Sequence, residues 1–97
     1  DITIDLTKLR LFREAFEKTR KQAIEEGIEQ GRKEGIEKGL KDAIESILIV
    51  KFGRRDKKLL AKIKKIKDID LLRKIKTEAM RTKSFNEFIK KIEKLKI

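Results

Sequence analysis

Small residues occupy every fourth position through the middle of the chain, within the run AIEEGIEQGRKEGIEKGLKDA. Residues four apart on an α-helix advance by about 400°, so such a row drifts by only about 40° per step. The sequence therefore predicts a helix with one slowly winding stripe almost free of side chains, against which a second backbone can pack closely. We call this stripe the small-residue row, and it consists of Ala23, Gly27, Gly31, Gly35, Gly39 and Ala43.

A glycine inside a helix costs about 1 kcal/mol relative to alanine, so another interaction must compensate the four glycines of the row. Close helix contact offers one, through dispersion and Cα–H···O contacts between backbones. Charged residues fill the intervals, so the run is too polar for a membrane span. The alternative is a flexible glycine tether. Regular spacing and oriented ion pairs favour the helix, and the pairs are Glu29–Lys33, Glu34–Lys38 and Glu37–Lys41.

Large apolar residues directly follow most members of the small-residue row and would flank its groove. A four-residue repeat drifts in the opposite sense to a heptad, so we expect a right-handed crossing with the partner helix. The sequence predicts self-association, with two copies favoured and the polarity of the pair left open. The predicted interface is the small-residue row together with Ile24, Ile28, Ile36 and Leu40.

The start of the chain predicts a short extended lead and then the long helix. Alternating apolar residues form the lead, and they are Ile2, Ile4 and Leu6. Asp5 or Thr7 can cap a helix expected over about residues 7–51. The first turns have an apolar face at spacings i, i+3 and i+7, formed by Leu9, Phe12 and Phe16. We assign residues 1–52 to this first domain.

The remaining residues, 53–97, predict a basic module of three short helices. Gly53 follows an apolar run and suits the left-handed residue that ends a helix. The N-caps of the short helices are expected at Asp56, at Asp68 or Asp70, and at Ser84, which forms a capping box with Glu87. Each short helix has one apolar face. The predicted fold class is therefore all-α, with one long helix followed by a small bundle of three short ones.

Composition limits the chemistry that this chain can perform. A chain of 97 residues buries a limited fraction of its surface unless it associates. It has no cysteine or histidine, which removes disulfides, thiolate chemistry and the usual acid–base group near neutral pH. The absence of cysteine also leads us to expect a cytoplasmic location. High lysine and glutamate content is typical of a thermophile's protein. Because the chain begins at Asp1 without methionine, we expect it to be part of a longer protein.

Candidate catalytic and metal-binding residues have simpler structural explanations. Ser84 has no histidine to activate it and is explained as a cap. Asp68 and Asp70, with Glu78, could suggest Mg²⁺ binding, but two carboxylates at a helix start are explained by capping and by the helix dipole. We therefore expect no catalytic residue, metal site, cofactor, small-molecule substrate or membrane partner.

Charge is distributed unevenly along the chain. Residues 1–50 hold ten basic and eleven acidic groups, a net −1, whereas residues 51–97 hold eighteen basic and six acidic groups, a net +12. A basic surface of this kind can be a solvated face, or it can contact nucleic-acid phosphates, an acidic protein surface or an anionic membrane. DNA is therefore the alternative partner, through Arg54, Arg55, Lys57, Lys58, Lys62, Lys64, Lys65 and Lys67.

The run EGIEQGRKEGIEKGLKDAIESILIVKFG, followed by short helices ending in SFNEFIKKIEKL, resembles the C-terminal tail of the recombination-promoting nucleases, a family of putative transposases. The resemblance covers about residues 20–95. It implies a nuclease domain of the PD-(D/E)XK type upstream, joined in copies by the tail. The nuclease motif itself has no match in this chain, so the resemblance assigns no activity to any of these residues.

Overall fold

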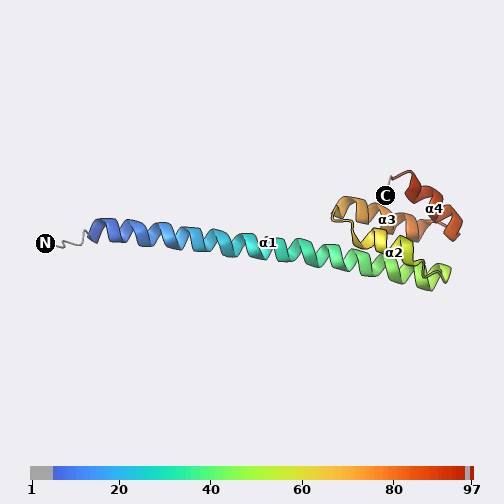
Figure 1. The fold of residues 1–97 in the computed structure, drawn as a ribbon, viewed down its shortest axis with the longest axis horizontal. Coiled ribbons are helices and arrows are strands. Elements are labelled where there is room, and N and C mark those ends of the chain that lie inside the picture. The colour runs from blue at the N-terminus through green and yellow to red at the C-terminus, as the bar shows by residue number, and fades with distance from the viewer. Residues whose placement is uncertain (1–5, 96) are drawn as a thin grey trace. The chain divides into compact units, whose positions relative to one another are not determined.

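The computed structural model describes residues 6–95 and residue 97, which form four helices (Figure 1). These are α1 (Leu6–Phe52), α2 (Lys57–Lys64), α3 (Ile69–Arg81) and α4 (Phe85–Glu93). No strand occurs among the described residues, so the predicted all-α class, with one long helix before three short ones, is confirmed. The extended lead, with Ile2, Ile4 and Asp5, lies outside the described residues.

Each short helix begins at an N-cap residue that the sequence predicted. Asp56 Oδ1 accepts hydrogen bonds from two amides of α2, at 3.1 and 3.2 Å, and Asp68 Oδ1 accepts one from α3 at 3.2 Å. Ser84 Oγ accepts from the Glu87 amide at 3.2 Å. The Glu87 carboxylate reaches back to the amide of Lys83 at 3.1 Å, one residue before the cap. These bonds satisfy amides that a helix start leaves without partners.

Gly53 ends α1 with the predicted left-handed conformation. Its φ is 64°, a region that costs glycine nothing and other residues appreciably more. The amides of Gly53 and Arg54 donate to the carbonyls of Ile49 and Leu48, at 3.0 and 3.2 Å. The chain can therefore leave the helix axis at once without leaving these carbonyls unpaired.

The chain forms two compact units, which divide between Lys33 and Glu34. The sequence suggested a division at residues 52–53 instead. The difference arises because the last turns of α1 belong to the hydrophobic core of the second unit, where Ile44 is 0% and Leu48 1% exposed. The buried core consists of Ile44, Leu48, Leu59, Ile63, Leu72, Ile75, Ala79, Phe88 and Ile92.

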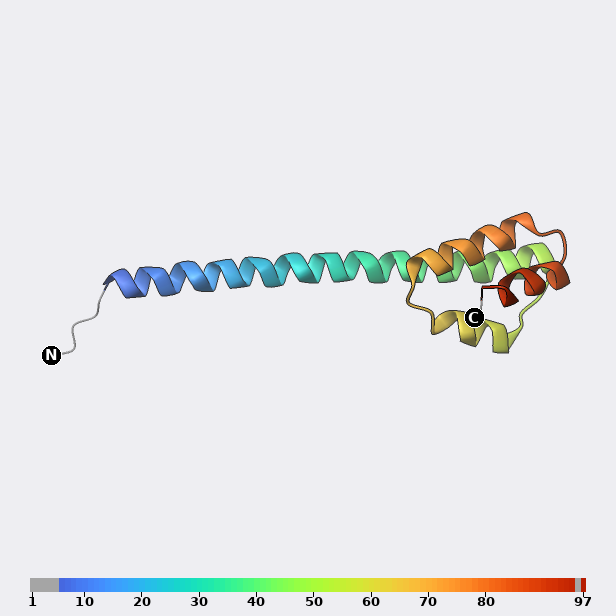
Figure 2. The same cartoon turned by 90° about the horizontal axis from the view of Figure 1, so that it is seen from above.

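Within the second unit, α2, α3 and α4 cover the last turns of α1 (Figures 1 and 2). Helices α3 and α4 also contact one another. Three phenylalanine rings pack at the end of α1, with centroids 6.2 Å apart for Phe52 and Phe85 and for Phe52 and Phe88. The rings of Phe85 and Phe88 are 6.4 Å apart. Phe88 belongs to the buried core, and Phe52 and Phe85 are half-buried and pack against it, on the apolar faces that the sequence indicated.

Two lysines of α1 cap the carboxyl ends of the short helices packed against it. Lys41 Nζ donates to the carbonyl of Lys64, the last residue of α2, at 2.6 Å. Lys51 Nζ donates to the carbonyls of Ala79 and Met80, in the last turn of α3, at 3.1 and 2.6 Å. The last carbonyls of a helix lack partners and carry partial negative charge, so a cation stabilises them. These long-range contacts fasten α2 and α3 to α1.

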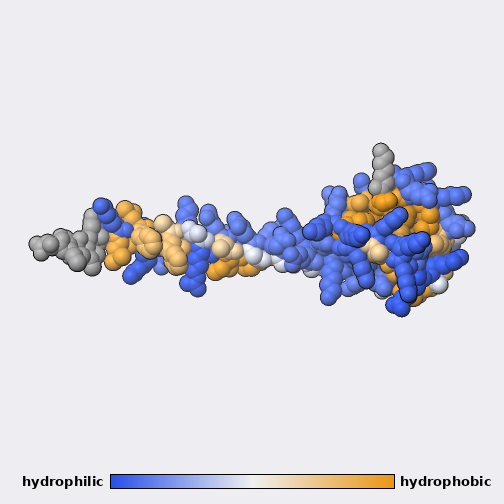
Figure 3. All heavy atoms as spheres, in the orientation of Figure 1, coloured by the Kyte–Doolittle hydropathy of each residue, from blue (hydrophilic) through white to orange (hydrophobic). Residues whose placement is uncertain are grey.

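The first unit contains α1 up to Lys33, and all its side chains from Thr7 onward are exposed. Figure 3 shows apolar surface among the charged side chains of this segment. Among the described residues, no helix has an apolar stretch long enough to cross a bilayer.

Candidate interaction surfaces

The small-residue row lies on α1 and faces open space. At each of its four glycines, no described atom outside the neighbouring stretch of helix lies within 4 Å of where a Cβ would stand. Ala23 is exposed as well, and Ala43 is half-buried. Crowding within the described chain therefore does not require glycine at any of these positions. Their helical φ angles do not require it either, since Gly53 alone among the described glycines has a positive φ.

The large apolar residues beside the row divide into an open part and a covered part. Ile24 is 52% and Ile28 68% exposed, both in the first unit. Ile36 and Leu40 are half-buried in the second unit, where Leu40 packs against the core. Beyond them, Ile44 is fully buried. The sequence placed all of these residues beside one groove, and the structure gives the later members a role inside the chain.

The apolar face predicted at the start of α1 has no cover in the first unit. Leu9 is 48%, Phe12 70% and Phe16 61% exposed. Leu11, which the sequence analysis did not single out, is 59% exposed. Singly exposed apolar side chains are ordinary, but contiguous ones mark interaction surfaces.

A second apolar surface lies where α1 meets α3. Val50 is 85% and Met80 60% exposed, and they border a shallow hollow together with Ser46, Ile47 and Lys51. Nothing in the sequence indicates that Met80 lies beside Val50, because the two residues come from different helices. The only hint of an exposed Met80 lies within α3, where its position does not fall on the helix face shared by the buried residues Leu72 and Ile75.

All eight residues of the predicted nucleic-acid contact are exposed. The two arginines among them have side-chain neighbours in the second unit. The Arg54 guanidinium lies 5.4 Å from the centre of the Phe85 ring, and Arg55 Nη2 lies 3.9 Å from Glu45 Oε1. The lysines of α2 are exposed, whereas Leu59 and Ile63 of the same helix are buried. The arrangement can contact phosphates without any rearrangement of the core.

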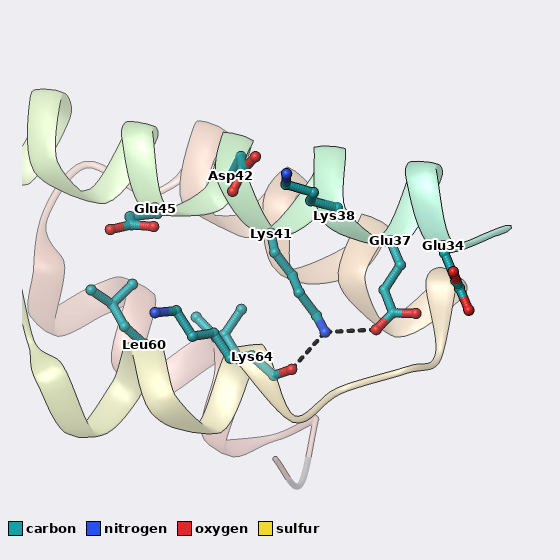
Figure 4. A pocket seen from close by; sticks show the side chains of 9 residues that line it. Glu34, Glu37, Lys38, Lys41, Asp42, Glu45, Leu60 and Lys64 are labelled. Atoms are coloured by element: carbon teal, nitrogen blue, oxygen red, sulfur yellow. Dashed lines mark hydrogen bonds and ion pairs between the residues drawn. The ribbon is translucent and has the colours of Figure 1, made fainter. Parts of the chain in front are cut away.

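A groove of about 310 Å³ lies between α1 and α2 (Figure 4). Lys41 is at its edge, with Nζ 2.7 Å from Glu37 Oε1 and 2.6 Å from the Lys64 carbonyl. The predicted pairing of Glu37 with Lys41 is confirmed. Although four carboxylate residues line this groove, the described residues contain no group of three or more side chains placed to hold a metal ion.

Glu29 pairs with Arg32 rather than with the predicted Lys33. Arg32 Nη2 and Nε donate to the two carboxylate oxygens at 2.6 and 3.0 Å. This two-point hydrogen bond lowers the pKa of Glu29, and the same bond raises the pKa of Arg32. A planar guanidinium matches both carboxylate oxygens, whereas an ammonium is a point charge, so arginine three residues away prevails over lysine four residues away.

No protein-family model matches this chain, and neither a curated protein nor a solved structure does.

Proposed function

We propose that α1 is a self-association helix, through which the chain forms a homodimer along the small-residue row. The observation that carries the proposal is the exposure of the whole first unit from Thr7 onward, including Phe12, Phe16, Ile24 and Ile28. A helical segment without tertiary cover is marginal in water, because most helical stability in proteins comes from packing of an apolar face.

The glycines make the case for a partner more specific. Gly27 and Gly31 weaken the helix by about 1 kcal/mol each relative to alanine, and an added Cβ would meet nothing there. Alanine would therefore be the better residue in a single chain. A groove that accommodates a second backbone supplies a reason for glycine, since small residues permit the close approach that dispersion and Cα–H···O contacts need.

The test places two leucines in the groove, in the variant G31L/G35L. The matched control, E29L/K33L, places two leucines with the same spacing two residues earlier along α1, on the opposite face. We expect sedimentation equilibrium to give a dimer for the parent and the control, and a monomer or an altered oligomer for G31L/G35L. An unchanged dimer in G31L/G35L would contradict the proposal.

DNA binding by the second unit is a second candidate function, and the exposure of all eight predicted basic residues favours it. Contacts to phosphates would give an affinity that falls steeply with salt and depends little on sequence. Reversing two of these eight charges, in K62E/K65E, should weaken a low-salt gel shift more than the control K90E/K91E on α4. The absence of any shift by the parent chain at low salt would exclude this function.

The resemblance to the tails of recombination-promoting nucleases fits either candidate. In that setting, the homodimer would hold two copies of an upstream nuclease domain. This larger role is part of the proposal, and its direct test is the sequence of the complete open reading frame.

A further inference from the structure

We infer that the shallow hollow between α1 and α3 is a docking site for an acidic amphipathic helix of another protein. The residues that line the hollow are Ser46, Ile47, Val50, Lys51 and Met80. All of them belong to the second unit and come after Ala43, the last member of the small-residue row. The inference therefore does not rest on the proposed self-association along that row.

The hollow has a volume of about 470 Å³ and an apolar floor that the second unit leaves open. Val50 is 85% and Met80 60% exposed, and Ile47 is half-buried and packs against the core. Contiguous exposed apolar side chains indicate an interaction surface, whereas single ones are ordinary. Methionine suits such a surface, because its flexible thioether side chain adapts to the shape of a partner.

The core holds both walls of the hollow in place before a partner binds. Leu48, on α1, is 1% exposed, and Ala79, the neighbour of Met80 on α3, is 0% exposed. Lys51 Nζ also joins the two walls, since it donates to the carbonyls of Ala79 and Met80 at 3.1 and 2.6 Å. A preformed site loses less conformational entropy on binding than a site that must first become ordered.

The charged residues closest to the apolar floor are cations. Positions three and four residues away on a helix share a face, so they are the neighbours of Ile47, Val50 and Met80 along α1 and α3. Among these positions, the charged residues are Lys51 and Lys76, and none is a carboxylate. Lys51 also lines the hollow itself.

The carboxylate residues next along these helices belong to other surfaces. Asp42 and Glu45 line the groove between α1 and α2, and Glu45 Oε1 lies 3.9 Å from Arg55 Nη2. Glu78 comes two residues before Met80, which places it about 160° away around α3. The hollow thus differs from the α1–α2 groove, because its own lining contains a cation and no carboxylate.

This combination of an apolar floor and a cationic edge favours an acidic partner. Residues 34–97 hold twenty basic and ten acidic groups, a net +10, so the second unit attracts an acidic surface as a whole. If the hollows of two copies faced each other, Lys51 and Lys76 would meet their own symmetry mates, and like charges would repel. Nucleic-acid phosphates would match the cations but would leave the apolar floor uncovered.

The partner segment is a helix rather than a strand. Both walls of the hollow are helices, and the described residues form no sheet to which a strand could add. An amphipathic helix presents apolar anchors at spacings i, i+4 and i+7 to such a groove and keeps its charged residues at the rim. Its anchors would cover Val50 and Met80, and its carboxylates would lie beside Lys51 and Lys76.

Fluorescence anisotropy of a labelled synthetic peptide tests the inference on the full chain. The probe is a helical peptide with leucines on one face and glutamates on the other, and the matched peptide has lysines in place of the glutamates. We expect binding of the glutamate peptide only, with an affinity that falls as salt is raised. V50S/M80S changes two exposed side chains and should weaken binding by about tenfold or more, with helical circular dichroism unchanged.

Two control variants separate docking in the hollow from general attraction to a basic protein. L11S/F12S removes two exposed apolar side chains from the first unit, and K62E/K65E reverses two charges outside the lining of the hollow. Both should weaken binding less than V50S/M80S does. The inference is overturned by no binding of the glutamate peptide, by equal binding of the lysine peptide, or by equal weakening in either control.

The same variant also tests other occupants of the hollow. If sedimentation equilibrium gave a dimer for the parent and a monomer for V50S/M80S, the hollow would be an interface between copies. If V50S/M80S lost binding to phosphatidylglycerol vesicles that the parent binds, the occupant would be a membrane surface. Either result overturns the inference, and unchanged mass and vesicle binding support it.

Discussion

The segment of α1 before Glu34 and the segment after it have the same spacing of small and large residues, but they differ in burial. After Glu34, Ile44 and Leu48 lie in the core with α2, α3 and α4, and Lys41 and Lys51 cap two of those helices. Before Glu34, side chains from Thr7 onward are exposed. The comparison shows that a row of apolar residues on a helix does not by itself determine whether other helices of the same chain will pack over it.

The same comparison explains the role of the glycines. The core of the second unit needs large side chains on α1, and it has them at every fourth position from Leu40 to Leu48. The small-residue row runs beside these residues but is left open along the helix. We therefore interpret the large row as intrachain packing in the second unit, and the open groove as the surface reserved for a second copy.

The largest expected effect separates the two segments by stability. Phe88→Ala removes a fully buried ring from the core, where such truncations cost about 3–5 kcal/mol. Phe12→Ala removes a ring that is 70% exposed and should leave the unfolding of the second unit unchanged. Urea denaturation, followed by a probe in the second unit, measures both variants. If both variants lowered the free energy of unfolding of the second unit equally, the division between a unit with its own core and an exposed helical segment would be contradicted.

A smaller effect is expected from the lysine that caps α3. Lys51→Met keeps much of the apolar stem but removes hydrogen bonds to the Ala79 and Met80 carbonyls, at a cost of about 1–2 kcal/mol. Lys74→Met, on an exposed position of α3, is the matched control. Thermal unfolding should show a lower Tm for Lys51→Met only. A Tm equal to that of the control would mean that the cap contributes nothing measurable.

Much of the fold follows from short-range patterns in the sequence. Asp56, Asp68, Ser84 and Gly53 act through residues within about six positions, so their roles are set before any tertiary contact forms. The apolar faces of the three short helices were predictable for the same reason. The class, the order of the helices and most of the core follow from these signals.

Long-range features could not be predicted in this way. Lys41 and Lys64 are 23 positions apart, and nothing in the sequence indicates that Lys41 caps the helix that ends at Lys64. The row of large residues is chemically alike on both sides of Glu34, so its division into exposed and buried parts depends on how far the bundle extends along α1. Met80 and Val50 likewise share a surface only because α3 folds back onto α1.

Hydrogen exchange as a function of protein concentration tests the central claim most directly. If a second copy covers the groove, the amides of residues 20–33 should become more protected as concentration rises, because association stabilises the helix by mass action. Amides of the second-unit core, such as those of Leu72 and Phe88, should keep constant protection. Protection of residues 20–33 that does not change with concentration would contradict self-association along this row.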